Sequence, residues 1–166
     1  MEKILYMATS LDGFISDENR EEDFLSSYNW EKFVELAEDA GAFVVGRKTY
    51  ETVRDWENHS YLDVNARRIV LSKQDSFAVD KGYEKFSSPR EVLDSISEID
   101  SLVLTGGAEV NYSFLDKEMI DRVILNIEPV LVGSGVSISS GTLNTNLKFV
   151  RMEREDNIVT VEYRTI

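Results

Sequence analysis

The residues best suited to chemistry in this sequence follow runs of apolar residues. In "FVVGRKTYE" the apolar run ends at Gly46, and Arg47, Lys48 and Thr49 come next. A guanidinium group can hold a phosphate with two hydrogen bonds, an ammonium group adds a point charge, and glycine lets the main chain approach a ligand. The pattern indicates an anion site, and an ordinary strand-to-helix turn with solvated cations is the alternative.

Two further segments repeat this arrangement. "RRIVLSKQ" places Ser72 and Lys73 directly after an apolar run that ends at Leu71, with a solvated loop as the alternative. "LVLTGGAEV" places Gly106 and Gly107 before a helix-like pattern. A helix N-terminus behind two glycines offers free N–H groups and the positive end of a dipole, which suits a pyrophosphate. The alternative is a tight turn with close packing, because the segment lacks the G-x-G-x-x-G pattern.

These segments need a scaffold that brings them together. Runs rich in β-branched residues predict strands at Lys3–Ala8, Ala42–Val45, Arg68–Leu71, Leu102–Leu104, Arg122–Glu128, Leu147–Glu155 and Ile158–Thr165. Helical patterns cover 29–40, 89–97 and 108–120, and a short helix is expected near Lys48. Alternation of strand and helix predicts parallel pairing, and Asp156-Asn157 predicts a closing antiparallel hairpin. We therefore expect one α/β domain over 1–166, with a mixed, mostly parallel sheet, helices on both faces and ligands at the carboxyl ends of the strands.

Composition narrows the function classes. The chain has 31 acidic and 18 basic residues and a net charge of −13, so we expect neither nucleic acid nor an anionic membrane as a partner. Cysteine is absent, and the apolar run in "MEKILYMATS" is too short for a signal peptide or a membrane span, which favours a cytoplasmic protein. His59 is the lone histidine and lies in a polar stretch, so we expect it at the surface and expect no catalytic metal.

Five motifs resemble, in order and spacing, the dihydrofolate reductase superfamily, especially the bacterial branch related to the reductase domain of riboflavin biosynthesis. They are "MATSLDGFIS" (7–16), "VVGRKTYE" (44–51), "IVLSK" (69–73), "LTGGAEV" (104–110) and "EPVLVGSG" (128–135). The resemblance implies a dihydrofolate reductase-like three-layer fold, with NADPH lying across the strand ends.

The resemblance also implies roles for individual residues. The cations and Ser72 would face the 2′-phosphate of NADPH, the two helix N-termini would hold its pyrophosphate, and Ala8 and Ile15 would flank the nicotinamide. The implied cofactor residues are Ala8, Ile15, Gly46, Arg47, Lys48, Thr49, Leu71, Ser72, Lys73, Thr105, Gly106, Gly107, Ala108 and Glu109.

Three positions depart from the family pattern. Glu109 stands where dihydrofolate reductases have an arginine, so Arg47 and Lys73 carry more of the expected phosphate clamp. Trp30 stands where those enzymes have a substrate carboxylate; it could stack on a flat heterocyclic substrate or be plain core. Phe14 stands where riboflavin-pathway reductases often have a lysine.

Asn126 and Asp12 are the candidate catalytic residues. By register, Asn126 in "VILNIEP" projects into the cleft as a substrate contact, or it is a satisfied polar group of a strand. Asp12 lies in the loop that borders the nicotinamide, where it forms an Asx turn or relays a proton. No buried carboxylate is evident, so we expect the proton to come from water or Asp12.

The strand-end motifs and the resemblance together predict an NADPH-dependent reductase that transfers a hydride to a planar heterocyclic substrate. The pteridine or pyrimidine class of that substrate is implied by the resemblance alone. The alternative is a non-catalytic NADP-binding sensor or regulatory domain that has lost the substrate carboxylate. Because family members often pair, we also expect a homodimer to which the terminal hairpin contributes.

Overall fold

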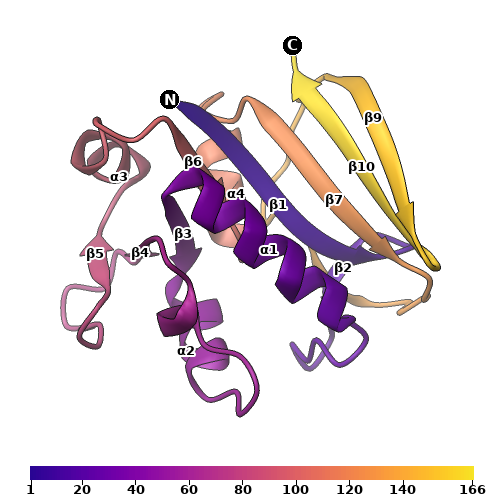
Figure 1. The fold of residues 1–166 in the computed structure, drawn as a ribbon, viewed down its shortest axis with the longest axis horizontal. Coiled ribbons are helices and arrows are strands. Elements are labelled where there is room, and N and C mark those ends of the chain that lie inside the picture. Colours follow the sequence, from indigo (N-terminus) through magenta and orange to yellow (C-terminus); the bar gives the residue numbers. More distant parts are fainter.

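The computed structural model describes Met1–Ile166 and shows an eight-stranded sheet between two layers of helices (Figure 1). The strands are β1 (Glu2–Ser10), β2 (Phe14–Asp17), β3 (Ala42–Gly46), β4 (Arg67–Leu71), β5 (Glu84–Phe86), β6 (Ser101–Leu104), β7 (Arg122–Glu128), β8 (Gly135–Ser137), β9 (Leu147–Glu155) and β10 (Ile158–Thr165). The helices are α1 (Ser27–Ala40), α2 (Arg47–Arg54), α3 (Pro89–Ser95) and α4 (Ala108–Leu115), with a 3₁₀ turn, η1, at Tyr61–Asp63.

The large sheet has the order β5-β4-β3-β6-β1-β7-β10-β9. All neighbours from β5 to β7 pair in parallel, and β10 and β9 then add two antiparallel pairings at one edge. The mixed sheet and the closing hairpin that the sequence predicts are therefore confirmed. Parallel pairing brings the carboxyl ends of β4, β3, β6 and β1 to one side of the molecule, where binding sites of such sheets form.

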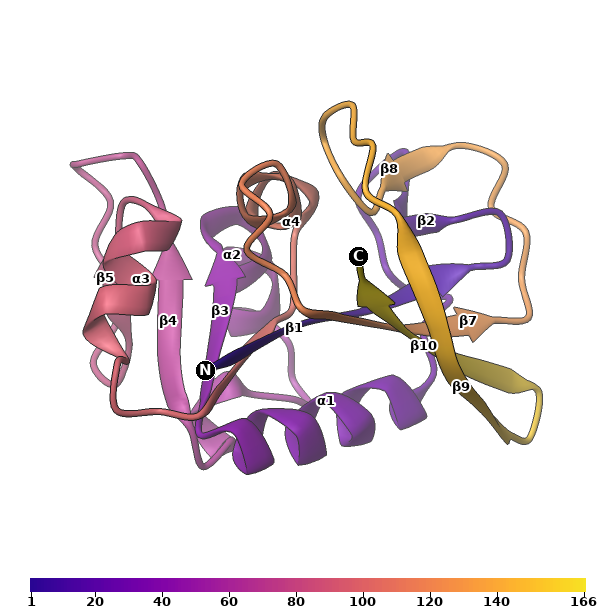
Figure 2. The ribbon, with the colours of Figure 1, turned by 90° about the horizontal axis from the view of Figure 1, so that it is seen from above.

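Side chains alternate between the two faces of the sheet, and each face has its own core. Val45 of β3 packs toward α1 and α2 with Phe33 and Tyr50, whereas its neighbour Val44 packs with Phe114 of α4 and with α3. Figure 2 shows α1 on one side of the sheet and α4 on the other. The three-layer fold expected from the resemblance is confirmed.

Local signals explain the start of α3 and the end of α4. Ser88 caps α3 by accepting a hydrogen bond from the Glu91 N–H, and Pro89 takes the first position. The helix predicted over 108–120 ends earlier, at Leu115, because Glu118 adopts a left-handed φ of 54° and turns the chain. Three strands of three or four residues, β2, β5 and β8, are absent from the prediction because such short segments show no readable periodicity.

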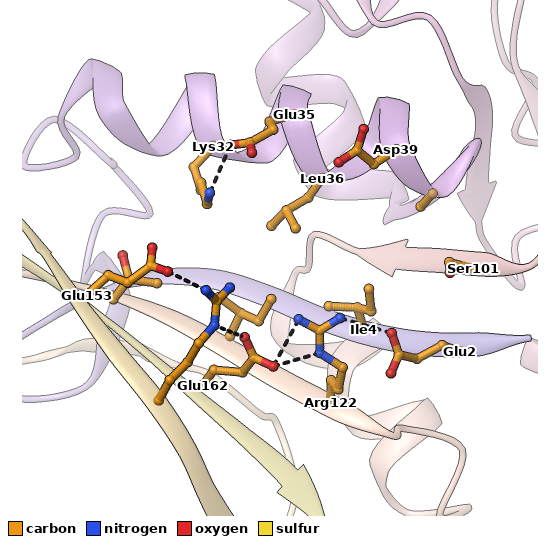
Figure 3. A pocket seen from close by; sticks show the side chains of 14 residues that line it. Glu2, Ile4, Lys32, Glu35, Leu36, Asp39, Ser101, Arg122, Glu153 and Glu162 are labelled. Carbon is orange, nitrogen blue, oxygen red and sulfur yellow. Dashed lines mark hydrogen bonds and ion pairs between the residues drawn. The ribbon is translucent and has the colours of Figure 1, made fainter.

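A charged hollow of about 290 Å³ lies between α1 and the strands β7 and β10 (Figure 3). The buried Glu162 carboxylate accepts hydrogen bonds from Arg122 and from Arg151, and Arg122 also binds Glu2. Burial raises the pKa of Glu162, but the two guanidinium groups outweigh it and hold the pKa below its ordinary value. Because its third cation, Lys32, is paired as well, this hollow is an internal ion network that ties the strands together.

Candidate active site

The three segments that the sequence singles out lie together at the carboxyl ends of β3, β4 and β6. In the β3–β4 register Gly46 stands opposite Leu71, directly before Ser72. The Gly46 N–H donates a hydrogen bond of 2.7 Å to the carbonyl oxygen of Gly106, at the end of β6. Segments about sixty residues apart in the chain therefore share one ledge, which we call the strand-end ledge.

Two helices begin on this ledge without a side-chain cap. α2 starts directly after Gly46, and α4 starts directly after Gly107. A Cβ atom on Gly46 would lie 2.9 Å from a methyl group of Val110, and one on Gly107 would lie 3.1 Å from the Thr49 hydroxyl oxygen. The glycines therefore allow the helices to pack closely, and they leave main-chain N–H groups open to an anion.

The cations beside the ledge are engaged with carboxylates of the same two helices. Arg47 donates a hydrogen bond of 2.7 Å to Glu51 within α2, and Lys48 reaches across to Glu109 of α4 at 2.9 Å. The hydrogen bond from Lys48 lowers the pKa of Glu109. Both pairs are at least partly exposed and contribute little to stability. A phosphate could therefore replace either carboxylate at small cost.

The end of β4 supplies a hydroxyl and a further cation. Ser72 is buried, and its Oγ accepts a hydrogen bond from the Gln74 N–H. Lys73 is exposed and forms no ion pair. Of the three predicted phosphate-binding cations, Lys73 is thus the one whose charge is not already matched.

A cleft of about 630 Å³ opens beside the ledge, between the end of β1, α1 and α2. Six of the predicted site residues line it: Ala8, Ile15, Trp30, Thr49, Thr105 and Gly107. The other predicted cofactor residues lie outside this lining, so the cleft adjoins the ledge and is distinct from its cations.

Aromatic side chains form the wall of the cleft around Trp30. The Trp30 ring stacks on His59 with centroids 4.7 Å apart and packs against Tyr61 at 5.6 Å and Trp56 at 6.3 Å. The prediction that His59 is a plain surface residue is wrong, because it is half-buried against Trp30 and lines the cleft. Its contact partner is far away in sequence, so no local pattern could show it.

Two carboxylates, one in the cleft lining and one directly behind it, escape sequence reasoning. Glu22 lies in the loop before α1 and lines the cleft, and burial raises its pKa to about 7. Glu128 is buried at the end of β7, where it accepts hydrogen bonds from the Ser26 N–H and hydroxyl and from the Asn29 amide. The expectation that no buried carboxylate lies near the site is therefore wrong for Glu128, which lies behind the cleft lining, whereas Glu22 in the lining is half-buried. Glu128 opens the "EPVLVGSG" motif, which was a usable signal, whereas Glu22 sits in an acidic run typical of a solvated loop.

Asn126 lies behind the cleft instead of projecting into it. Its amide donates hydrogen bonds of 2.7 Å to the Tyr6 hydroxyl and to Asn29, and its carbonyl accepts one from Thr160. The side chain is fully buried and absent from the cleft lining, whereas Tyr6 and Asn29 line it. The prediction that Asn126 contacts the substrate is therefore wrong. Sheet register correctly indicated which face of β7 the side chain lies on, but Tyr6 and Asn29 cover that face and separate Asn126 from the cleft.

Asp12 ties two loops together. One of its carboxylate oxygens accepts hydrogen bonds from the Ser10 hydroxyl and the Val132 N–H, and the other accepts one from the Gly133 N–H. These hydrogen bonds lower the pKa of Asp12 to about 2. Asp12 is ionised at neutral pH and does not line the cleft, so the geometry favours a structural tether over the expected proton relay.

Sequence comparison places the chain in a family. Residues 3–161 match the profile of the RibD C-terminal domain. The chain belongs to the RibD C-terminal domain family.

No group of three or more His, Asp or Glu side chains is arranged to hold a metal ion, and none of the helices is both long and apolar enough to span a membrane.

Three solved structures share the fold over almost the whole chain. A candidate riboflavin biosynthesis protein from Shewanella sp. PV-4 is 25% identical, with a TM-score of 0.80, 100% of this chain covered and 99% of the other. A Thermotoga maritima diaminohydroxyphosphoribosylaminopyrimidine deaminase/5-amino-6-(5-phosphoribosylamino)uracil reductase is 24% identical, with a TM-score of 0.79; 99% of this chain spans 56% of that one. Dihydrofolate reductase from Enterococcus faecalis, complexed with NADP(H) and RAB-propyl, is 15% identical, with a TM-score of 0.78 and coverage of 99% and 96%. Membership of the RibD C-terminal family supports a reductase-like function, and these neighbours show the shared fold.

Proposed function

We propose that this protein is an NADPH-dependent reductase that reduces a planar heterocyclic substrate. The observation that carries the proposal is the strand-end ledge, where Gly46 and Gly106 join two strand ends and two uncapped helices begin side by side. Such helix N-termini favour a pyrophosphate. The fold is shared with the Enterococcus faecalis enzyme that was solved with NADP(H), which supports the choice of cofactor.

The ledge suits the cofactor in both shape and charge. The glycines at the starts of α2 and α4 leave no side chain over the main-chain N–H groups, and the Thr49 hydroxyl stands beside Gly107. Arg47, Lys48 and Lys73 would bind the 2′-phosphate with help from Ser72, and Ala8 and Ile15 would flank the nicotinamide at the mouth of the cleft. NADPH supplies the hydride when bound.

The chain's own residues hold the cleft wall and its loops in place. Tyr6 and Asn29 are fixed by the buried Asn126, so that part of the cleft wall is rigid. Asp12 holds the loop after β1 against the loop after β7, which keeps the segment leading to Ile15 in place. We propose a positioning role for Asn126 and a tethering role for Asp12.

Tryptophan fluorescence tests cofactor choice directly. Titration with NADPH and with NADH should give tight binding of NADPH and weak binding of NADH. Arg47→Ala should weaken NADPH binding by about 1.5–3 kcal/mol, the scale of a charged hydrogen bond, and leave NADH almost unchanged. The matched control is Arg54→Ala, an exposed cation at the far end of α2, which should bind NADPH like the wild type. Equal losses for both cofactors would refute the placement of Arg47.

The alternative, an NADP-binding sensor without activity, is separated by turnover. Loss of NADPH absorbance with a panel of pteridines and pyrimidines, dihydrofolate included, supports the reductase. Tight NADPH binding without turnover of any of them would favour the sensor.

The homodimer and the cytoplasmic location stay predictions. Support for the homodimer comes from β9, an edge strand whose nine residues are all exposed, among them Phe149 at 54% and Met152 at 68%. If this edge pairs with a second copy, Met152→Glu should shift the wild-type dimer to a monomer in analytical ultracentrifugation, while Lys148→Glu, outside the apolar positions, should not.

A further inference from the structure

The charge of the cleft is one-sided. Four carboxylate side chains line it, from Glu22, Asp23, Asp55 and Glu57, and no lysine or arginine does. The charged hollow beneath α1, in contrast, contains three cations, each paired with a carboxylate. The acidic lining of the cleft is therefore a local property and does not simply follow from the acidic composition of the chain.

This lining opposes a phosphorylated substrate. A phosphate brought among these carboxylates would meet repulsion, and no lysine or arginine lines the cleft to offset it. The N-terminus of α1 also lies there, but the N–H of its cap residue, Ser26, already donates to the Glu128 carboxylate. The name of the Thermotoga maritima enzyme describes a reductase for a phosphoribosylamino compound, whereas the cations of the present chain lie on the strand-end ledge, outside the cleft lining.

Glu22 gives the cleft a specific recognition group. Its carboxylate has no hydrogen-bond or ion-pair partner among the side chains, although it faces the cleft and is half-buried. Glu22 lines the same cleft as Tyr61, and burial together with the negative charge of Glu22 raises the pKa of Tyr61. A desolvated carboxylate that lacks a donor is stabilised by a ligand that supplies N–H groups or a positive charge.

We propose that the substrate is a flat, phosphate-free nitrogen heterocycle that binds as a cation, with its N–H groups donating to Glu22 and its ring against the aromatic wall formed by Trp30, Trp56, His59 and Tyr61. This inference rests on the proposed function, because it names the substrate class of the same cleft. It explains the absence of any cation from the lining: a cation there would repel the ligand. An indole-rich wall also favours a positively charged ring.

The test uses three probes of similar ring size with different charges. 2,4-Diaminopyrimidine is protonatable, uracil is its neutral counterpart, and uridine 5′-monophosphate carries a phosphate. Tryptophan fluorescence at neutral pH and without NADPH should show the diamine binding at least about tenfold more tightly than uracil, the scale of one charged hydrogen bond. The nucleotide should give no response. Tighter binding of the nucleotide than of the diamine would overturn the proposal.

Glu22→Gln identifies the recognition group. This variant should weaken binding of the diamine by about 10- to 100-fold. It should leave uracil binding within about threefold, since uracil carries no positive charge for the carboxylate to attract and the amide oxygen still accepts a hydrogen bond. The matched control is Asp23→Asn, the next residue on the same wall, which should change diamine binding much less. Unchanged diamine binding in a folded Glu22→Gln variant would refute the role of Glu22. If that variant does not fold, binding of the three probes to the wild type tests the proposed substrate class without it. NADPH titration of the wild type separates the two proposals. Normal NADPH binding by a wild type that shows no preference for the diamine over uracil would refute only the substrate class. Absence of NADPH binding to the wild type would refute the proposed function.

Discussion

Replacement of Glu22 by glutamine should change how the free energy of unfolding depends on pH. Burial raises the pKa of Glu22 from 4.5 to about 7 in the folded state, so the folded protein binds more protons than the unfolded chain between those values. The stabilising contribution of the protonated carboxyl is fully present below pH 4.5 and is lost as the pH rises through 7. The difference between a pKa of 4.5 and one of about 7 corresponds to at most about 3 kcal/mol of unfolding free energy, reduced wherever water reaches the carboxyl.

Urea denaturation of the wild type and of Glu22→Gln across this pH range measures the effect. Because every other titrating group is common to both proteins, the difference in unfolding free energy isolates Glu22. The variant should gain stability relative to the wild type as the pH rises, with most of the change between about pH 5 and pH 8. Asn58→Ser, a non-titrating change in the same cleft wall, is the control and should give a constant difference. A constant difference for Glu22→Gln would show that the carboxyl is solvated and would remove it from the cleft wall.

Three further changes test the packing and the tethers. Gly46→Ala should cost about 1–3 kcal/mol of unfolding free energy, because its Cβ would lie 2.9 Å from a Val110 methyl group. In urea melts the double variant with Val110→Ala should recover part of this cost, and strictly additive losses would contradict the contact. Glu162→Gln should destabilise by on the order of 3 kcal/mol at neutral pH by leaving two guanidinium groups without their shared carboxylate. Because the folded pKa of Glu162 lies below 4.5, the difference from the wild type should shrink as the pH falls through that folded value, and a loss that grows toward acid would refute the network. Asp12→Ala should increase hydrogen exchange at the Val132 and Gly133 amides, and unchanged protection there would exclude the tether.

Long, strongly patterned segments made most of the fold predictable from the sequence. β-Branched runs and the Asp156-Asn157 turn predicted the parallel strands and the closing hairpin because those features are local. The end of α4 was harder to place, since "DKEMI" reads as helix and only the left-handed turn at Glu118 shows that it is not. The strands β2 and β8 pair with each other across at least 118 positions of sequence, the separation of Asp17 and Gly135, and are too short to show alternation.

The part of the site at the strand ends was predictable from glycines and cations that follow apolar runs in the sequence. Glycines and cations at strand ends pointed to the ledge, because parallel strands bring their carboxyl ends together. Glu22, His59 and Asn126 were not predictable, since their environments come from long-range packing: an acidic loop folds against an aromatic wall, and a polar strand residue is covered by Tyr6 and Asn29.

A crystal structure of the protein with NADPH tests the central claim most directly. The account predicts pyrophosphate oxygens within hydrogen-bond distance of the main-chain N–H groups that begin α2 and α4, with the 2′-phosphate beside Arg47 and Lys73. A cofactor seated away from the Gly46–Gly106 hydrogen bond, or no cofactor at saturating NADPH, would contradict it.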